Sequence, residues 1–409
     1  MPVATMGDEH MKNGARTAVC IIVENLPVPL DRRVWREACT LRDTGYHVSI
    51  ICPKGSDSCS ASYERLEGID IYRHRRWEAS RITGYLLEYS LALAAESYLA
   101  LKVFARTRFR ILQACNPPDT IFLIGLLLRL FGVRFIFDHH DLVPELFESR
   151  FGRRIGLLYR LTRLLERCTF RAAKVCIATN ESFKEIAVTR GRKHPDSVFV
   201  VRNCPDLRSL SPGMPPAQLT LRKSRFVVVY VGFMGPQDGL RLLVDAIEHI
   251  VKHENRQDTH FVLVGGGAEL PMLRAVVTER GLASFVTFTG QVPYAHVAAY
   301  LSSADIGVAP DPKTPMNDKS TMIKILEYMA FGLPVVLFDL QEGRRIAGSA
   351  ALYASPNDPV DFAHQIMRLL NCEQLRRELG TCGRRRVEDC LNWQVEQSTL
   401  IEAYETALR

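Results

Sequence analysis

Short runs of β-branched and aromatic residues alternate with longer helical patterns along almost all of this 409-residue chain. Such alternation is typical of βαβ units, in which parallel strands are joined by helices that cover the sheet. The pattern occurs once before residue 203 and again after residue 224. It predicts two doubly wound parallel-sheet domains, and 409 residues are in any case too many for one ordinary core.

The division between the two sets lies in residues 203–224, which are rich in Pro and Ser and lack periodicity. The first residues are polar and are typical of a loose tail, and the last segment, which contains Trp393, has the pattern of an amphipathic helix. The sequence therefore predicts five segments: a disordered tail over 1–16, a first domain over 17–205, a linker over 206–224, a second domain over 225–390 and a final helix over 391–409.

The excess of positive charge lies in the first half, where residues 1–205 hold 31 Lys and Arg against 22 Asp and Glu. The densest part, 151–174, follows a helical pattern. It is either a solvated helix face whose Arg stems cover the core, or a surface for anionic lipid or a phosphorylated acceptor. Aromatic residues do not interleave with the basic ones, so we expect no nucleic-acid partner.

The eleven cysteines are scattered and form no CxxC pair, which indicates reduced thiols rather than a disulfide frame or a zinc site. No uncharged apolar run reaches the length of about 18 residues that a membrane span needs. We therefore expect a cytoplasmic protein, with peripheral contact at the inner membrane face through its basic first domain.

The segment "NDKSTMIKILEYMAFGLPVV", residues 317–336, predicts a helix followed by a buried strand. If Ser320 or Thr321 caps the helix, then Ser320, Lys324 and Glu327 share one face. The first amides of such a helix bind a diphosphate well, Lys324 adds a cation, and Glu327 can accept hydrogen bonds from a diol. The alternative is a Lys–Glu pair on a solvated face.

Two glycine-rich loops follow predicted strands in the second half. "VGFMGPQDGL", 231–240, contains Gly232 and Gly235 and would let the backbone approach a phosphate, although no P-loop Lys follows. "VGGGAELPML" contains Gly265, but Leu270 stands where a dinucleotide fingerprint needs its third glycine. This broken fingerprint disfavours an NAD-dependent oxidoreductase.

The segment "DHHDLVPE", 138–145, places two histidines and two aspartates at the end of an apolar strand. It is either a metal site or a strand end whose histidines are hydrogen-bonded. Neighbouring side chains of an extended chain point to opposite faces, so His139 and His140 do not suit one mononuclear site. We predict no metal site.

Together these motifs resemble those of a bacterial retaining glycosyltransferase of family 4, with the GT-B fold, from about residue 17 to the end. The matching segments are "PVPLDRRVWREA", "FDHHDLVPEL", "IATNES", "VVRNCPD", "VGFMGPQDGL", "FVLVGGGAELPML", "VTFTGQVP" and "NDKSTMIKILEYMAFGLPVV".

The resemblance implies two Rossmann-like domains that face each other across a cleft. The second domain would hold a nucleotide sugar, UDP-linked by the family's habit, and the first would receive a hydroxyl acceptor. The last helix would cross back to the first domain, and neither a metal nor another cofactor is implied. The acceptor is either a lipid-linked saccharide or a small secondary-metabolite aglycone.

The resemblance also implies roles for particular positions. Catalysis would involve His140, beside the donor sugar, together with Lys324 and Glu327. The residues implied to bind the donor are Gly232, Gly235, Gly265, Gln291, Val292, Asp318, Lys319, Ser320, Thr321, Met322, Ile323, Lys324 and Glu327. The residues implied on the acceptor side are Asn116, His139 and Asp141.

Two departures from the family's pattern stand out. The first of its paired glutamates is replaced by Lys319, and Asp318 is a candidate to supply the missing contact. The loop "FMGPQDG" lacks the usual cationic clamp, for which Lys324, Arg202 or Lys319 would compensate. The missing first glutamate keeps open the alternative of a non-catalytic nucleotide-sugar-binding subunit. A nucleotide-sugar 2-epimerase is a second alternative on this fold, although the acidic residues that it needs near the sugar are not found in the sequence.

Overall fold

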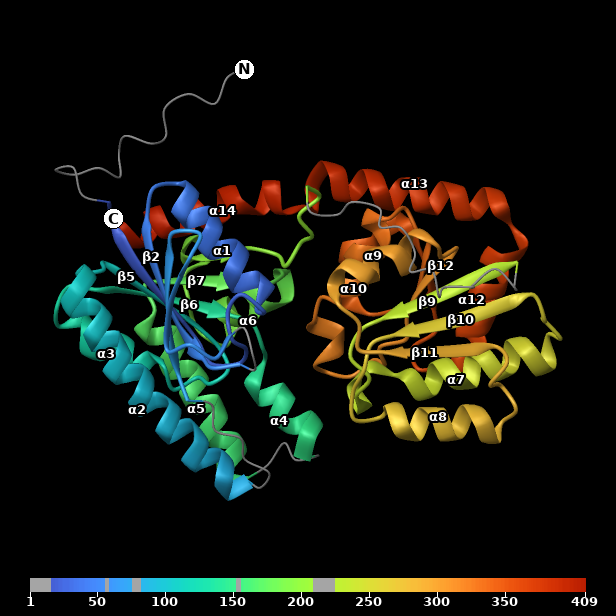
Figure 1. The fold of residues 1–409 in the computed structure, drawn as a ribbon, viewed down its shortest axis with the longest axis horizontal. Helices are drawn as coiled ribbons and strands as arrows, with labels where there is room; N and C mark the ends of the chain where they lie inside the picture. Colours follow the sequence, from blue (N-terminus) through green and yellow to red (C-terminus); the bar gives the residue numbers. More distant parts are fainter. Residues whose placement is uncertain (1–15, 56–58, 76–81, 152–155, 209–224) are drawn as a thin grey trace, which may run out of the picture. The chain divides into compact units, whose positions relative to one another are not determined.

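The structure is a computed structural model that describes residues 16–55, 59–75, 82–151, 156–208 and 225–409. The chain forms two compact units (Figure 1). Unit 1 comprises Met1–Arg202 with Gln397–Arg409, and unit 2 comprises Asn203–Glu396. The predicted tail and linker lie almost entirely outside the described residues.

The described residues of unit 1 form an eight-stranded sheet with the strand order β3-β4-β2-β1-β5-β6-β7-β8. Neighbouring strands are parallel, except that β3 is antiparallel to β4. The strands are β1 (Ala18–Val23), β2 (His47–Pro53), β3 (Tyr63–Leu66), β4 (Ile69–His74), β5 (Ile111–Cys115), β6 (Arg134–His139), β7 (Val175–Ala178) and β8 (Val198–Val200).

Helices cover both faces of this sheet, with α2, α3 and α5 on one face and α1 and α14 on the other (Figure 1). The Asp31 carboxylate caps α1 by accepting from the backbone N–H of Val34 at 3.1 Å. The helices are α1 (Arg32–Asp43), α2 (Ile82–Thr107), α3 (Phe122–Arg129), α4 (Val143–Phe151), α5 (Leu157–Ala172), α6 (Glu181–Thr189), the 3₁₀ helix η2 (Pro195–Ser197) and α14 (Trp393–Leu408), most of which belongs to unit 1.

The described residues of unit 2 form a six-stranded parallel sheet with the order β11-β10-β9-β12-β13-β14. Alternate residues of β9 point to opposite cores, with Val228 facing one and Val229 the other. The strands are β9 (Phe226–Val231), β10 (Thr259–Val264), β11 (Val286–Gly290), β12 (Ile306–Ala309), β13 (Val335–Phe338) and β14 (Ala351–Ala354).

Helices α7, α8 and α12 bury one face of this sheet, and α9, α10, α11 and α13 bury the other. The α-helices are α7 (Leu240–Glu248), α8 (Leu270–Glu279), α9 (Tyr294–Ser302), α10 (Ile323–Ala330), α11 (Gln341–Ala347), α12 (Pro359–Asn371) and α13 (Glu373–Cys390). The other turns are η4 (Pro236–Asp238), η5 (His249–His253), η6 (Asn317–Lys319) and η7 (Gly348–Ala350), of which η5 is a π-helix.

Two parallel-sheet α/β domains, as the alternating pattern predicted, are thus confirmed. In such sheets ligands bind beyond the carboxyl ends of the strands, which is where the candidate residues of both units lie. Within the described part of the chain, no helix combines the length and apolarity needed to span a membrane.

Candidate active site

The helix predicted within residues 317–336 begins later than expected. α10 starts at Ile323 and its N-cap is Met322, which makes no side-chain capping bond. Ser320 instead ends η6 in an extended conformation, and its hydroxyl donates to the Met316 carbonyl at 2.8 Å. The predicted cap at Ser320 or Thr321 is therefore wrong, and Ser320 does not share a helix face with the residues of α10.

Lys324 lies in the first turn of α10 and is largely buried. Its Nζ donates to Asp311 Oδ1 at 2.7 Å and lies 4.8 Å from the centre of the Tyr230 ring. The alternative of an exposed Lys–Glu pair is thereby excluded for Lys324. Asp311, which follows β12, was missed in the sequence; an acid two residues after a buried strand was the available signal.

The loops after β9 and β10 lie backbone against backbone. The Gly232 N–H donates to the Val264 carbonyl at 3.0 Å. Gly265 has a φ of +134°, and a Cβ there would lie 1.9 Å from the Gly232 carbonyl oxygen. A Cβ at Gly232 would lie 3.4 Å from Lys324 Cε. Only glycine allows the two backbones to approach this closely. The close approach brings Gly232, Gly265 and Lys324 together.

Three other predicted donor residues lie in the loops after β9 and β11. Gly235 is the N-cap of η4, and its N–H donates to Asp238 Oδ2 at 3.0 Å. Gln291 is exposed after β11, and its backbone N would lie 3.6 Å from a Cβ at Gly266. Val292 is half-buried against the core.

The residues before and within α10 have different environments. Asp318 Oδ1 accepts from the Gln341 N–H at 2.9 Å, so this carboxylate is engaged at the start of α11. Ile323 is exposed at the start of α10, and Glu327 is half-buried one turn further on. Partly exposed residues are Lys319, Thr321 and Met322.

A hollow of about 210 Å³, including its open side, lies beside the Lys324 partner Asp311. Its lining residues are Ala309, Asp311, Ser320, Met322, Ile325, Leu337, Phe338, Leu340 and Gly343. The chain that leads into α10 therefore forms part of a concave surface.

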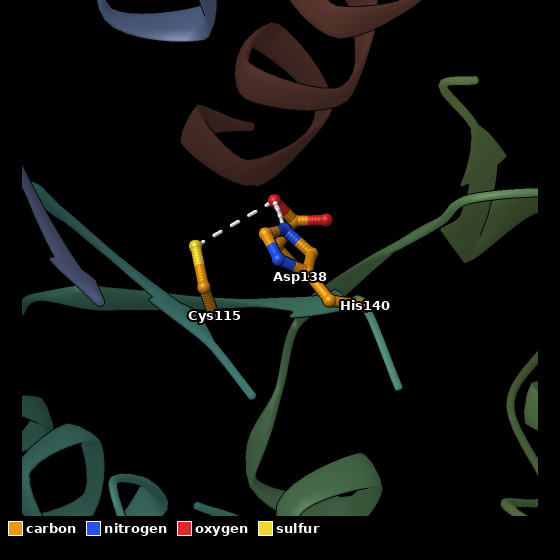
Figure 2. A group of neighbouring side chains, drawn as sticks. All are labelled: Cys115, Asp138 and His140. Carbon is orange, nitrogen blue, oxygen red and sulfur yellow. Dashed lines mark hydrogen bonds and ion pairs between the residues drawn. The ribbon is translucent and has the colours of Figure 1, made fainter. Parts of the chain in front are cut away.

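In unit 1, the end of β6 carries a buried acid–histidine pair. Figure 2 shows Asp138 and His140 side by side, with Cys115 across from them. His140 Nε2 lies 2.7 Å from Asp138 Oδ2, and the side chain of His140 is 16% exposed. Burial disfavours the imidazolium, but the Asp138 carboxylate outweighs it and raises the pKa of His140.

Arg33 of α1 holds this pair from the other side. Its Nη2 donates to Asp138 Oδ1 at 2.9 Å, and its Nη1 donates to the Val201 carbonyl at 2.8 Å. Its Nε lies 3.1 Å from Glu37 Oε1, and Gln113 Nε2 bridges Glu37 and Asp138 at 2.7 and 3.0 Å. Burial, with Asp138 nearby, raises the pKa of Glu37 to about 7.

Cys115, Asp138 and His140 could geometrically hold a metal, because their donor atoms lie within 4.8 Å of one another. However, the Arg33 guanidinium lies 3.0 Å from His140 Nε2 and also binds Asp138. A cation already stands where the metal charge would be needed. We therefore assign no metal to this group.

Asn116 has a structural role that was not predicted. Its Oδ1 accepts from the backbone N–H groups of His140 and Asp141 at 2.7 and 3.2 Å. Its Nδ2 donates to Asp119 Oδ1 and to the Asp141 carbonyl at 3.0 and 2.8 Å. These bonds use the full hydrogen-bonding capacity of the amide, so its contact with an acceptor, which stays a prediction, would not be a further hydrogen bond. Asn116 fixes the backbone around His140.

His139 is also corrected, because its side chain has no exposed surface. Its ring packs against Phe137, Phe170 and Phe183, with centroids 5.2, 5.2 and 4.9 Å away. Burial lowers the pKa of His139 to about 3 and keeps the ring neutral. The His139 side chain therefore cannot contact an acceptor. Asp141 is half-buried, and its contact with an acceptor stays a prediction.

The residues that sequence reasoning missed are mainly partners of the predicted ones. Arg33 and Glu37 were inside a quoted motif, and their spacing of four on a buried helix face was the available signal. Gln113 occupies the middle of an apolar strand, where a fully buried amide implies a polar partner.

Two family models match the chain, one in each unit. Residues 30–204 match the model described as "Glycosyl transferase 4-like domain", and residues 225–372 match "Glycosyl transferases group 1". The fold and these matches define a GT-B protein of two Rossmann-like domains. The chain belongs to the group 1 and family 4 glycosyltransferases, as the resemblance implied.

Individual proteins agree with this assignment. The phosphatidyl-myo-inositol mannosyltransferase of Mycobacterium leprae is 31% identical over 182 residues, which are 44% of this chain and 46% of the relative. The chain spans about half the length of the curated relatives it matches.

Two solved structures show the same fold over nearly the whole chain. Sucrose-phosphate synthase from Thermosynechococcus elongatus has a TM-score of 0.76 at 20% identity, covering 96% of this chain and 99% of the other. Anabaena HepE, solved in complex with UDP and glucose, has a TM-score of 0.69 at 15% identity, covering 95% and 99%.

Proposed function

We propose that this protein is a retaining glycosyltransferase that moves a sugar from a UDP-linked donor to a hydroxyl acceptor. The acceptor is a lipid-linked saccharide or a small secondary-metabolite aglycone. One observation carries the proposal: Gly232, Gly265 and the buried Lys324 meet at the carboxyl ends of β9 and β10 and the start of α10. Bare backbone beside a fixed cation suits a diphosphate.

The donor would bind in unit 2 through backbone and charge. The amides of residues 321–323 would receive the diphosphate at the positive end of α10, and Lys324 would share its charge between the diphosphate and Asp311. Glu327, one turn on, would accept from the ribose hydroxyls. As the sugar bond breaks, these groups would stabilise the charge that develops on the leaving diphosphate.

His140 would contribute from unit 1. Asp138 pairs with its Nε2, and Asn116 holds its backbone N–H, so both ring and main chain have fixed positions. Its backbone carbonyl or the remaining ring edge would stabilise positive charge on the sugar. The acceptor hydroxyl would attack from the face of the leaving group, and a diphosphate oxygen would take its proton.

Named relatives support the two substrate classes. The M. leprae relative is called a phosphatidyl-myo-inositol mannosyltransferase, which favours a lipid-linked acceptor, and a 2-deoxystreptamine glucosyltransferase of Streptomyces kanamyceticus favours a small aglycone. HepE, solved with UDP and glucose, favours uracil as the donor's base.

Calorimetric titration with UDP, GDP, ADP and NAD, in the presence of EDTA, tests the donor site. UDP should bind without metal. Glu327→Ala should weaken that binding by about 1–3 kcal/mol, the usual contribution of a hydrogen bond to a charged group. The control is Glu373→Ala, which removes an exposed glutamate of α13 and should leave UDP affinity unchanged. Unchanged affinity in Glu327→Ala would remove its ribose role, and binding of NAD alone would refute the proposal.

His140→Ala separates chemistry from binding. It should lower turnover far more than it lowers UDP affinity, whereas exposed His194→Ala should change neither. Product anomeric configuration, read by NMR, tests retention. Because Lys319 stands at the position of a family glutamate, a non-catalytic nucleotide-sugar-binding subunit is the second candidate function. UDP binding without any sugar transfer would favour that candidate. Isomerised donor without an acceptor would instead indicate an epimerase.

A further inference from the structure

Three histidines and a glutamate gather around η5 and α12 in unit 2. His249 and His253 belong to the π turn η5, Glu254 follows it, and His364 lies in α12, which packs against η5. His249 Nε2 and His364 Nε2 lie 3.6 and 3.8 Å from Glu254 Oε1. Two imidazoles from separate helical elements thus converge on one carboxylate.

The π turn is what brings the first two of these side chains together. The Glu254 N–H donates to the His249 carbonyl at 3.1 Å, a bond that spans five residues instead of the four of an α-helix. On an α-helix, residues three and four apart are neighbours, and residues five apart are not. The extra residue in the turn returns Glu254 to the side of His249.

The distances fit a metal ion after a small adjustment. The donor atoms of His249, Glu254 and His364 all lie within 4.8 Å of one another. Zinc takes nitrogen and oxygen donors at about 2.0–2.2 Å, which puts tetrahedral donors about 3.4 Å apart. The two histidine–glutamate distances need to shorten by only a few tenths of an ångström, and the two histidines by at most about 1.4 Å. The side chains of His249, Glu254 and His364 are 21%, 37% and 53% exposed, so they can rotate by this amount and admit water to the remaining positions.

We propose that His249, Glu254 and His364 form a binding site for a divalent transition-metal ion such as zinc, which fastens η5 to α12. Two imidazoles and one carboxylate suit zinc, nickel or copper, whereas magnesium and calcium prefer oxygen donors. The ring nitrogens of His249 and His364 make no hydrogen bond to any residue of the described chain. His253 stacks on His249, with centroids 5.1 Å apart, and restricts the orientation of that ring.

The site is separate from the proposed donor site. η5 leads into the first residue of β10, whereas Gly232 and Gly265 follow the last residues of β9 and β10. In a parallel sheet, the starts of the strands and the ends of the strands lie on opposite sides of the sheet. The metal would therefore stabilise unit 2 without entering the transfer reaction, and its test does not depend on the proposed function.

Zinc titration of the full-length chain tests the site. The protein, without a histidine tag, is freed of metal with EDTA, exchanged into buffer with a non-thiol reductant, and titrated with Zn²⁺ against a chromogenic indicator. We expect one strong equivalent. Glu254→Gln and His364→Gln should each weaken it by about 10–100-fold or more, since even loss of an outer-shell partner has that effect. Zinc should raise the Tm of the wild type by a few degrees, and magnesium should not.

His194→Gln is the matched control, because His194 is an exposed histidine 3.5 Å from the carboxylate of Asp196 in unit 1. It should bind zinc as the wild type does. Wild-type affinity in both Glu254→Gln and His364→Gln would overturn the proposal. Loss of the strong equivalent in the double variant Cys372→Ser/Cys390→Ser, which removes two exposed thiols, would also overturn it. The substituted site residues are partly or fully exposed, and circular dichroism checks that the variants fold.

Discussion

The two units build the ends of their strands in contrasting ways. In unit 1, the residues after β5 and β6 surround a buried network in which Arg33 binds both Asp138 and Glu37. In unit 2, the corresponding loops expose glycine backbone, and the buried ion pair of Lys324 with Asp311 lies beside them. The first arrangement depends on side chains that neutralise one another, and the second depends on side chains that are absent.

This contrast fits what each unit is proposed to hold. A residue such as His140 has to be held in one orientation, and a buried polar network in a low-dielectric interior does this well. A phosphate has to approach the main chain closely, and glycine allows that approach. At the carboxyl ends of two similar sheets, one unit thus has a network of buried side chains that fixes a residue, and the other has glycines that leave room for a ligand.

Arg33→Met should have the largest effect on stability, because it leaves Asp138 and Glu37 buried without their cation. We expect a loss of about 3–5 kcal/mol in the free energy of unfolding of unit 1, measured by urea denaturation. Exposed Arg32→Met on the same helix is the control and should stay within about 0.5 kcal/mol of the wild type. A small effect of Arg33→Met would show that the network does not depend on this charge.

Lys324→Met should destabilise unit 2 by about 3 kcal/mol, the lower end of the range for a broken buried pair, because one carboxylate rather than two loses its partner. The double variant Lys324→Met/Asp311→Leu removes the orphaned charge and should recover most of that stability. A double-mutant cycle in urea measures the coupling. Additive losses would mean that the pair contributes no interaction energy.

Gly265→Ala tests the other half of the contrast. The new Cβ would meet the Gly232 carbonyl at a φ of +134°, so we expect a loss of about 2–3 kcal/mol together with weaker UDP binding. Gly281→Ala separates the two causes, because Gly281 also has a positive φ, +68°, but open space around its Cβ position. It should lose about 1 kcal/mol and keep UDP affinity. Equal losses would attribute the effect to φ alone.

The fold could be predicted because buried parallel strands are short apolar runs separated by helical patterns, a signal that local sequence contains. The start of α10 could not be predicted from local sequence. Residues 317–319 form a separate turn, and Asn317 holds it through bonds from Nδ2 to the Gln237 and Pro312 carbonyls at 2.9 and 3.0 Å. Those partners are distant or irregular in sequence, so helical periodicity alone placed the cap too early.

The site was predictable where a residue's own position indicates its role, and not where a partner decides it. Lys324 stood out in a helix pattern, but its partner Asp311 is thirteen residues away in the loop after β12. The opposite orientations of His139 and His140 follow from strand geometry, yet which of them is buried depends on the phenylalanines of other elements. Pairings between elements belong to tertiary structure.

These two neighbouring histidines should have opposite effects on pH dependence, which is the smallest and finest test. Burial opposes charge on His140, but Asp138 raises its pKa, so the folded state binds this proton more tightly than the unfolded state does. The resulting stability is fully present below about pH 6.5, the ordinary value, and is lost as the pH rises through the folded pKa. The stability difference between wild type and His140→Gln should therefore shrink from pH 6 to pH 9.

For His139 the change of folding stability with pH has the opposite sign. Burial lowers its pKa to about 3, so between pH 6.5 and 3 the unfolded chain binds a proton that the folded chain does not. Stability is then full above about pH 6.5 and declines as the pH falls. His139→Phe removes this titration, so its stability relative to the wild type should rise on acidification. Urea denaturation of both variants between pH 5 and 9 compares the two slopes. Slopes of the same sign would show that Asp138 and the phenylalanine pocket do not impose opposite charge states on adjacent residues.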